Sequence, residues 1–305
     1  MHKPGADFAD HRIETADLVV NYLCEGSGPP LVLLHGWPEF RRSWKKNITA
    51  LAARFDVIAP DLRGFGDTRR KDGKPAEKTT AGLLSADLTA FLDALGISRV
   101  GIVSHDVGAY VAQTFARFSP DRVAALFFFN CPYPGIGARW GEGSYLPEAF
   151  YQYFHQWPLA EKLVGYNRDT CRIYFSHFLH RWSVDQHAFD DDLEMWVDNF
   201  MKPGNLTGGF EWYRGALAMR LKWIKEGAPK LELLGVKRTL IGSAPMSAFD
   251  PKRTWAVQDC CCANLRLNPI SPVANPCCNP ALKIGVVLSL GMGDETALQS
   301  RRRTS

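Results

Sequence analysis

An aspartate at the centre of a short turn motif is the most informative candidate for chemistry in this sequence. The stretch S-H-D-V-G (104–108), with Asp106 in the middle, follows the apolar run 100–103 and precedes a segment of helical character. Small residues two positions before and after the apex permit a nucleophile elbow, the sharp strand-to-helix turn that exposes the apex side chain. The plainer alternative is that Asp106 is the N-cap of the following helix.

The residue type at this apex selects among reactions. A carboxylate can displace a leaving group at a saturated carbon and form an ester, which water can later cleave at the carbonyl group. A serine in the same role would form an ether, which has no such exit. Asp106 therefore favours ring opening or halide displacement over ester hydrolysis.

A second motif could supply an oxyanion hole. H-G-W-P (35–38) follows the apolar run 31–34, and its glycine allows a tight turn that aims the backbone N–H of Trp37 at the same point as the N–H of Val107. Two such donors would hold the ester oxygen that becomes an oxyanion during deacylation. The Trp37-Pro38 peptide bond can also be cis. The glycine-rich stretch D-L-R-G-F-G-D (61–67) is assigned a structural role.

These motifs need a scaffold that brings the ends of several strands together. Residues 18–130 alternate apolar runs with helical segments, the pattern of a mainly parallel sheet flanked by helices. The strands are expected at 18–23, 31–34, 56–59, 100–104 and 123–130, and the helices at 43–53, 80–95 and 107–118. Residues 1–130 are therefore assigned to an α/β core, and the aromatic-rich segment 131–227 to an inserted helical cap. Residues 228–241 should return to the sheet through a strand at 236–241.

Composition limits the function classes. The chain has 305 residues, of which 46% are hydrophobic and 22% charged, so it is neither disordered nor fibrous. Its formal net charge of +4 is too small to indicate nucleic-acid binding. Apolar runs are far shorter than a membrane span, and the N-terminal residues lack a signal-peptide pattern. We expect a cytoplasmic protein, and its oligomeric state stays open.

Taken together, the motifs resemble a known family. Residues 18–241 are similar to α/β hydrolases of the epoxide hydrolase and haloalkane dehalogenase branch, with H-G-W-P, D-L-R-G-F-G-D and S-H-D-V-G-A in the family's order and spacing. The resemblance extends into the cap through F-Y-Q-Y-F (150–154) and E-W-Y-R (211–214). It implies an aspartate nucleophile at Asp106 and no metal or organic cofactor.

The resemblance also implies roles for two cap tyrosines. Epoxide hydrolases use two such phenols to bind the epoxide oxygen and protonate the leaving alkoxide, which yields a vicinal diol. A phenol can do this because it donates a proton while staying neutral at pH 7. Tyr151 and Tyr213 match these positions, and Tyr153 is the alternative to Tyr151 if the alignment slips by two residues. The simpler reading is that these rings only pack the cap core.

Other branches of the family match less well. Haloalkane dehalogenases carry Asn after the H-G pair and Trp after the nucleophile to hold halide, where this sequence has Trp37 and Val107. Fluoroacetate dehalogenases carry Arg one and four residues after the nucleophile, where this sequence has Val107 and Tyr110. An epoxide hydrolase acting on a small apolar epoxide is therefore favoured. The alternatives are a haloalkane dehalogenase-like hydrolase of halide-type substrates and a non-catalytic remnant of the fold.

The second half of the family's mechanism lacks its residues. A late histidine should activate water and an acid should orient it, but no histidine follows His187. One family position for the acid, 24 residues after Asp106, is occupied by Asn130, and near the other only Asp250 is available. No general-base histidine is assigned, and the sequence predicts that the ester would persist and the activity be impaired.

The family pattern stops where the composition changes. Residues 242–305 hold five of the eight cysteines but little aromatic character, so we expect this tail to lie outside the fold and the C-terminal part of the core to be missing. Three readings stay open: a frameshift or readthrough product, a divergent end of a non-catalytic relative, and a metal or redox module. The C-C-C-x14-C-C spacing lacks the geometry of common zinc sites, and no metal is assigned.

Overall fold

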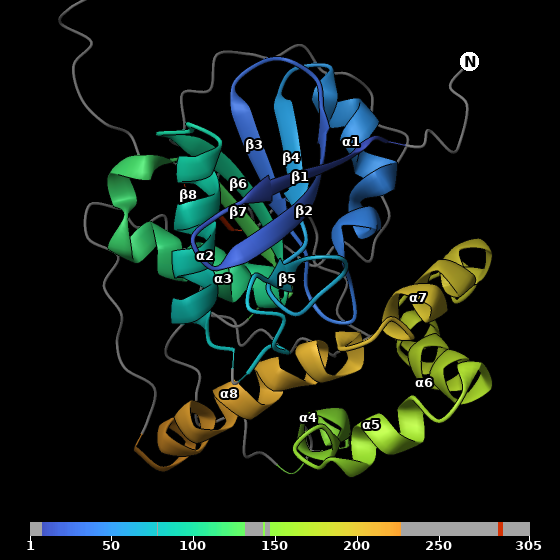
Figure 1. Ribbon diagram of the computed structural model, residues 1–305. Helices are drawn as coiled ribbons and strands as arrows, with labels where there is room; N and C mark the ends of the chain where they lie inside the picture. The colour runs from blue at the N-terminus through green and yellow to red at the C-terminus, as the bar shows by residue number, and fades with distance from the viewer. Residues whose placement is uncertain (1–7, 78, 132–142, 144–146, 227–285, 289–305) are drawn as a thin grey trace, which may run out of the picture.

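A mixed β-sheet organises the protein, whose computed structural model describes residues 8–77, 79–131, 143, 147–226 and 286–288 (Figure 1). Its strands are β1 (Asp10–Glu14), β2 (Leu18–Glu25), β3 (Pro30–Leu34), β4 (Asp56–Pro60), β5 (Arg69–Arg70), β6 (Val100–His105), β7 (Val123–Phe129) and β8 (Val286–Leu288). They follow the order β1-β2-β4-β3-β6-β7-β8, with β5 on β2. The pairs β3–β4, β3–β6 and β6–β7 are parallel. The predicted sheet of mainly parallel strands is therefore confirmed in its centre.

Helices cover both faces of this sheet. In the core they are η1 (Arg41–Trp44), α1 (Lys45–Ala52), α2 (Ala81–Ala94), α3 (Val107–Phe118) and η2 (Pro120–Arg122). Side chains alternate along a strand, so Leu31 and Leu33 of β3 pack with Ile48 of α1 on one face. Val32 and Leu34 point to the other face, in the larger cluster that includes α2 and α3. Every residue of this apolar run is therefore buried, because β3 packs against helices on both faces of the sheet.

The ends of the core helices follow local signals. Thr80 accepts a hydrogen bond from the backbone N–H of Leu83 and caps the start of α2. Gly96 follows the end of α2 with φ of 71°, the left-handed conformation that suits glycine after a helix. The expected helix at 80–95 contains α2, and the expected helix at 107–118 coincides with α3.

Two antiparallel strands were not predicted. β1 pairs with β2 at one edge of the sheet, and β5 pairs with Leu18 and Val19 at the start of β2. The β1 sequence D-H-R-I-E is almost entirely exposed, so it carries no apolar alternation from which a strand could be read. Charged, exposed edge strands of this kind resist pairing with other chains.

The cap is helical and lies across the carboxyl ends of the central strands, below the sheet in Figure 1. It contains α4 (Phe150–Phe154), α5 (Leu159–Val164), α6 (Arg168–Arg181), η4 (Asp190–Asp192), α7 (Leu193–Phe200) and α8 (Asn205–Glu226). Two buried side chains tie it to the core. The indole N–H of Trp196 donates to the carbonyl oxygen of Pro38 at 2.7 Å, and the amide of Asn205 donates to that of Gly66 at 2.8 Å.

Most of the C-terminal segment lies outside the described residues, including the expected strand at 236–241, Asp250 and the five clustered cysteines. Residues 286–288 are described as β8, which pairs antiparallel with β7. For these three residues the structure differs from the prediction that 242–305 lies outside the fold. The physical reason is that β7 would otherwise present unpaired backbone groups at the sheet edge, and V-V-L has a high strand propensity.

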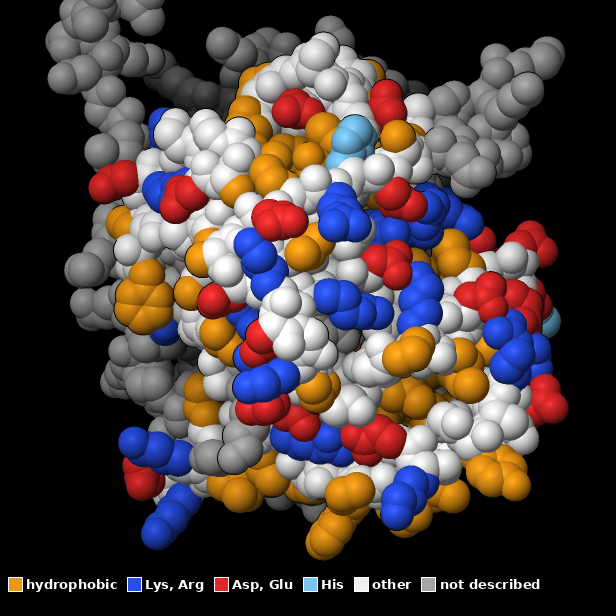
Figure 2. Space-filling view, viewed as in Figure 1, with side chains coloured by type: hydrophobic (Ala, Val, Ile, Leu, Met, Phe, Trp, Pro, Cys, Tyr) orange, Lys and Arg blue, Asp and Glu red, His pale blue; other side chains and the backbone are white. Residues whose placement is uncertain are grey.

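Acidic and basic side chains alternate on the face of the molecule in Figure 2. Among the described residues, ion pairs join different elements, such as Lys45 of α1 with Asp192 of the cap and Arg168 of α6 with Glu194 of α7. Across the described ranges, none of the helices combines the length and the apolar character that crossing a bilayer requires.

Candidate active site

Asp106 occupies a strained turn between β6 and α3. Its φ of 48° and ψ of −113° are unusual for a residue with a side chain. The turn is closely packed: a Cβ on Gly36 would lie 2.4 Å from that of Asp106, and a Cβ on Gly108 would lie 2.5 Å from the carbonyl oxygen of Leu34. Only glycine fits at both places, which is the steric requirement of a nucleophile elbow. Backbone strain of this kind is typical of functional sites.

The two predicted oxyanion-hole donors both reach the Asp106 carboxylate. The backbone N–H of Trp37 donates to Oδ1 at 2.9 Å, and the N–H of Val107 also interacts with this group. The Trp37–Pro38 peptide bond is cis. Burial raises the pKa of Asp106 above its usual range, while the charge of His105 and the two N–H groups oppose that rise. Backbone donors thus hold the Asp106 carboxylate in place at the apex of the turn.

A charge pair beside Asp106 was not predicted from the sequence. Glu39 accepts hydrogen bonds from the backbone N–H of Gly36 and from Nδ1 of His105, both at 2.9 Å. Burial opposes the ionisation of Glu39, but the neighbouring His105 outweighs it and the pKa of Glu39 falls to about 2. The imidazole Nε2 of His105 contacts the amide of Asn130 at 3.1 Å. The one sequence feature that could have indicated Glu39 and His105 is their position, because Glu39 follows the H-G-W-P motif and His105 lies within the elbow motif.

Cap and core meet at three aromatic rings. Tyr151 stacks on Trp37, with ring centroids 5.1 Å apart and planes 6° apart. Tyr213 packs edge-on against both rings, at 5.5 Å from Trp37 and 5.4 Å from Tyr151. Tyr151 and Tyr213 are 8% and 3% exposed, whereas Tyr153 is 41% exposed. The structure therefore brings Tyr151 and Tyr213 together beside the Trp37 loop and leaves Tyr153 at the surface.

The protonation state of Tyr213 suits a proton donor. Burial raises the pKa of this phenol well above 10, and the nearby Tyr151 and Asp106 raise it further. A phenol with such a pKa is neutral at pH 7 and keeps its proton until a stronger base forms beside it. An alkoxide released from an opened ring is such a base.

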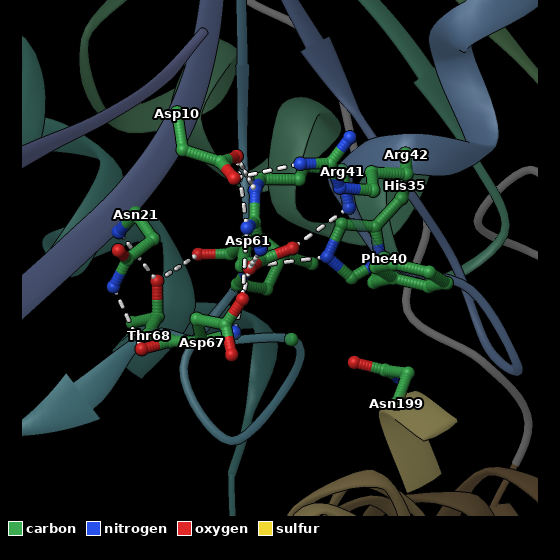
Figure 3. A network of polar contacts seen from close by, with 12 residues as sticks. Asp10, Asn21, His35, Phe40, Arg41, Arg42, Asp61, Asp67, Thr68 and Asn199 are labelled. Atoms are coloured by element: carbon green, nitrogen blue, oxygen red, sulfur yellow. Dashed lines mark hydrogen bonds and ion pairs between the residues drawn. The ribbon is translucent and has the colours of Figure 1, made fainter. Parts of the chain in front are cut away.

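The glycine-rich loop that follows β4 has the predicted structural role. Asp61 lies at the centre of a polar network (Figure 3), where its carboxylate accepts the backbone N–H groups of Arg41 and Asp67, both at 2.7 Å. The guanidinium group of Arg41 contacts Asp10, Asp61 and Asp67. Lys202 of the cap also contacts Asp67. The loop is thus fixed both to the core and to the cap.

The other sequence-predicted elements of the site are not described. Asp250 lies outside the described residues. Among the residues that are described, no group of three or more His, Cys, Asp or Glu side chains could hold a metal ion.

The sequence of this chain matches known proteins. A family model described as the alpha/beta hydrolase fold matches residues 29–164. The soluble epoxide hydrolase of Corynebacterium sp. (strain C12) is 32% identical over 224 residues, which cover 70% of this chain and 74% of that protein. Epoxide hydrolase 2 of Siraitia grosvenorii is 33% identical over 237 residues, covering 69% and 72%.

Solved structures give the same relationship. The structure of the epoxide hydrolase CorEH without ligand superimposes with a TM-score of 0.62 at 32% sequence identity, covering 70% of this chain and 75% of that one. This chain belongs to the α/β-hydrolase family and is an epoxide hydrolase-like enzyme of that family.

Proposed function

We propose that this enzyme opens a small apolar epoxide through an ester on Asp106. A carboxylate oxygen of Asp106 attacks a ring carbon, the carbon–oxygen bond of the ring breaks, and its electron pair moves to the ring oxygen. Tyr151 and Tyr213 hydrogen-bond that oxygen, and one of them gives it a proton. The product of this step is a hydroxyalkyl ester of Asp106, and water added at the ester carbonyl would release a vicinal diol.

The observation that carries the proposal is the position of two buried phenols against Trp37, whose backbone N–H binds Oδ1 of Asp106 at 2.9 Å. One residue thus links the proton donors to the nucleophile. The same N–H, together with that of Val107, would stabilise the oxyanion formed when water attacks the ester.

Release of the diol is expected to be slow in this chain. The family's water-activating histidine has no counterpart after His187. Within the described residues, His105 is already engaged with Glu39. We therefore propose that the Asp106 ester accumulates.

The experiment is intact-mass spectrometry after incubation with a simple aryl epoxide such as styrene oxide. We expect one adduct of substrate mass that is absent in Asp106→Asn and forms much more slowly in Tyr151→Phe and in Tyr213→Phe. Tyr153→Phe is the matched control and should react like the unaltered chain, because this tyrosine is at the surface.

Each other outcome points to a different function. An adduct that persists in Asp106→Asn refutes the assigned nucleophile. Absence of both adduct and diol favours a non-catalytic member of the fold, while halide release from a haloalkane indicates a dehalogenase. Rapid diol formation without accumulated ester would contradict only the proposed impairment.

A further inference from the structure

A chain of three side chains connects α8 to one of the proposed proton donors. Arg220 lies two turns after Tyr213 on α8, and its Nη1 contacts Oε1 of Gln152. The amide Nε2 of Gln152 then donates to the hydroxyl oxygen of Tyr151 at 3.0 Å. Gln152 and Tyr151 are each only 8% exposed, so the Gln152–Tyr151 bond is shielded from water.

The direction of these hydrogen bonds is fixed by chemistry. A guanidinium group has only donors, whereas an amide has one accepting oxygen and one donating nitrogen. Arg220 must therefore face the oxygen of Gln152, which turns the NH2 group towards Tyr151. The hydroxyl oxygen of Tyr151 accepts in this bond, so its own proton is directed away from Gln152.

Arg220 also approaches the second phenol. Its Cζ lies 5.8 Å from the ring centroid of Tyr213. Although burial raises the pKa of Tyr213, the positive charge of Arg220 works in the opposite direction and favours release of the proton. A single cation thus acts on both proposed donors.

We propose that Arg220 is a positioning residue, which sets the polarity of the Gln152–Tyr151 hydrogen bond and so directs the Tyr151 proton to the epoxide oxygen; this rests on the proposed function. The alternative is a purely structural role, in which the contact between Arg220 and Gln152 only holds α4 against α8. The two roles differ in what they require of Gln152. Tying the helices together needs only an acceptor for Arg220, whereas orienting Tyr151 also needs a donor.

Gln152→Glu separates these roles. A carboxylate keeps the contact with Arg220 but has no N–H to donate, so Tyr151 must give it a hydrogen bond and point its proton away from the substrate. We expect the rate of ester formation, followed by intact mass with styrene oxide, to fall at least about tenfold, because a positioned proton donor contributes about 100-fold or more. The melting temperature should not fall. Gln186→Glu, at an exposed position of the cap, makes the same charge change and should not alter the rate.

Two further variants keep the test decisive if Gln152→Glu does not fold. Arg220→Met removes the group that orients the amide and should slow ester formation several-fold. Arg220→Lys should restore most of the rate, because an ammonium group is also donor-only. Lys222→Met, at an exposed position two residues further along α8, is the control for loss of a positive charge.

The last experiment tests whether the effect of Gln152→Glu on the rate requires the Tyr151 hydroxyl. In a Tyr151→Phe background, Gln152→Glu should have no further effect on the rate, because the group it acts on is gone. An unchanged rate in Gln152→Glu, or equal rates in Arg220→Met and the unaltered chain, would overturn the role of Arg220 while leaving the proposed function intact. An unaltered chain that forms no ester, or forms it equally fast as Tyr151→Phe, would overturn both.

Discussion

The contact between Gly208 of α8 and Gly64 of the loop after β4 determines how closely the cap approaches the core. A methyl group built on Gly208 would lie 1.9 Å from the carbonyl oxygen of Gly64. A carbon and an oxygen in close contact are about 3.3 Å apart. The substitution Gly208→Ala therefore requires α8 and the loop to separate by roughly 1.4 Å, because neither backbone can rotate away as a side chain could.

This displacement should affect both stability and chemistry. Overpacking of this kind costs about 1–3 kcal/mol of the free energy of unfolding, which lowers the melting temperature by roughly 2–10 °C in a chain of this size. Tyr213 lies on the same helix, five residues after Gly208. Misplacement of a reacting group by about 1 Å can cost about 100-fold in rate, and we expect a loss of that order in formation of the Asp106 ester.

The assays are thermal unfolding and the rate of adduct formation by intact mass. Gly82→Ala is the matched control, because a methyl group there meets only the Thr80 hydroxyl at 3.9 Å. It should raise the free energy of unfolding by up to about 1 kcal/mol and leave the rate unchanged. If Gly208→Ala keeps both the melting temperature and the rate of the unaltered chain, the cap does not depend on this contact and the reasoning is refuted.

Two further predictions concern buried charges. Burial raises the pKa of Asp106 above 3.8, and His105 opposes that rise. In the proposed mechanism the ionised carboxylate attacks, so acidification should abolish ester formation with a midpoint above pH 3.8. His105→Gln should move this midpoint to still higher pH in a pH–rate profile. A shift to lower pH would contradict the assigned effect of His105. Arg41→Met leaves the fully buried Asp61 carboxylate without its guanidinium partner and should cost about 3 kcal/mol of the free energy of unfolding in urea. Arg42 pairs with the partly exposed Asp10, so Arg42→Met should cost less than about 1 kcal/mol. Equal losses in the two variants would argue against this difference.

Local signals in the sequence were enough for the central strands, for the helices that flank them and for the turn at Asp106. The apolar runs predicted the central strands because a parallel sheet is buried on both faces. The segment 107–118 was predicted as the helix that follows the elbow, and α3 has those bounds. The need for glycine at position 108 could also be predicted, because the tight turn of a nucleophile elbow leaves room only for a small residue two positions after the apex.

Tertiary structure decided which cap side chains face the core. Tyr151 and Tyr153 are two residues apart, about 200° around a helix, so one faces inward and the other outward. The sequence left open which of them does so, because that depends on how α4 docks; the burial of Tyr151 beside Trp37 and the exposure of Tyr153 follow from that docking.

Long-range polar pairs also came only from the tertiary structure. Glu39 and His105 are 66 residues apart, and Gln152 and Arg220 are 68 apart. No periodicity of the chain relates such residues, since a hydrogen bond across the fold depends on the packing of the elements that carry them. The sequence by itself determined the elements and the chemistry available in each motif. Only the packing of these elements against one another determined which donor meets which acceptor, because the polarity of a side chain is set by its own residue type, whereas its partner is carried by a distant element.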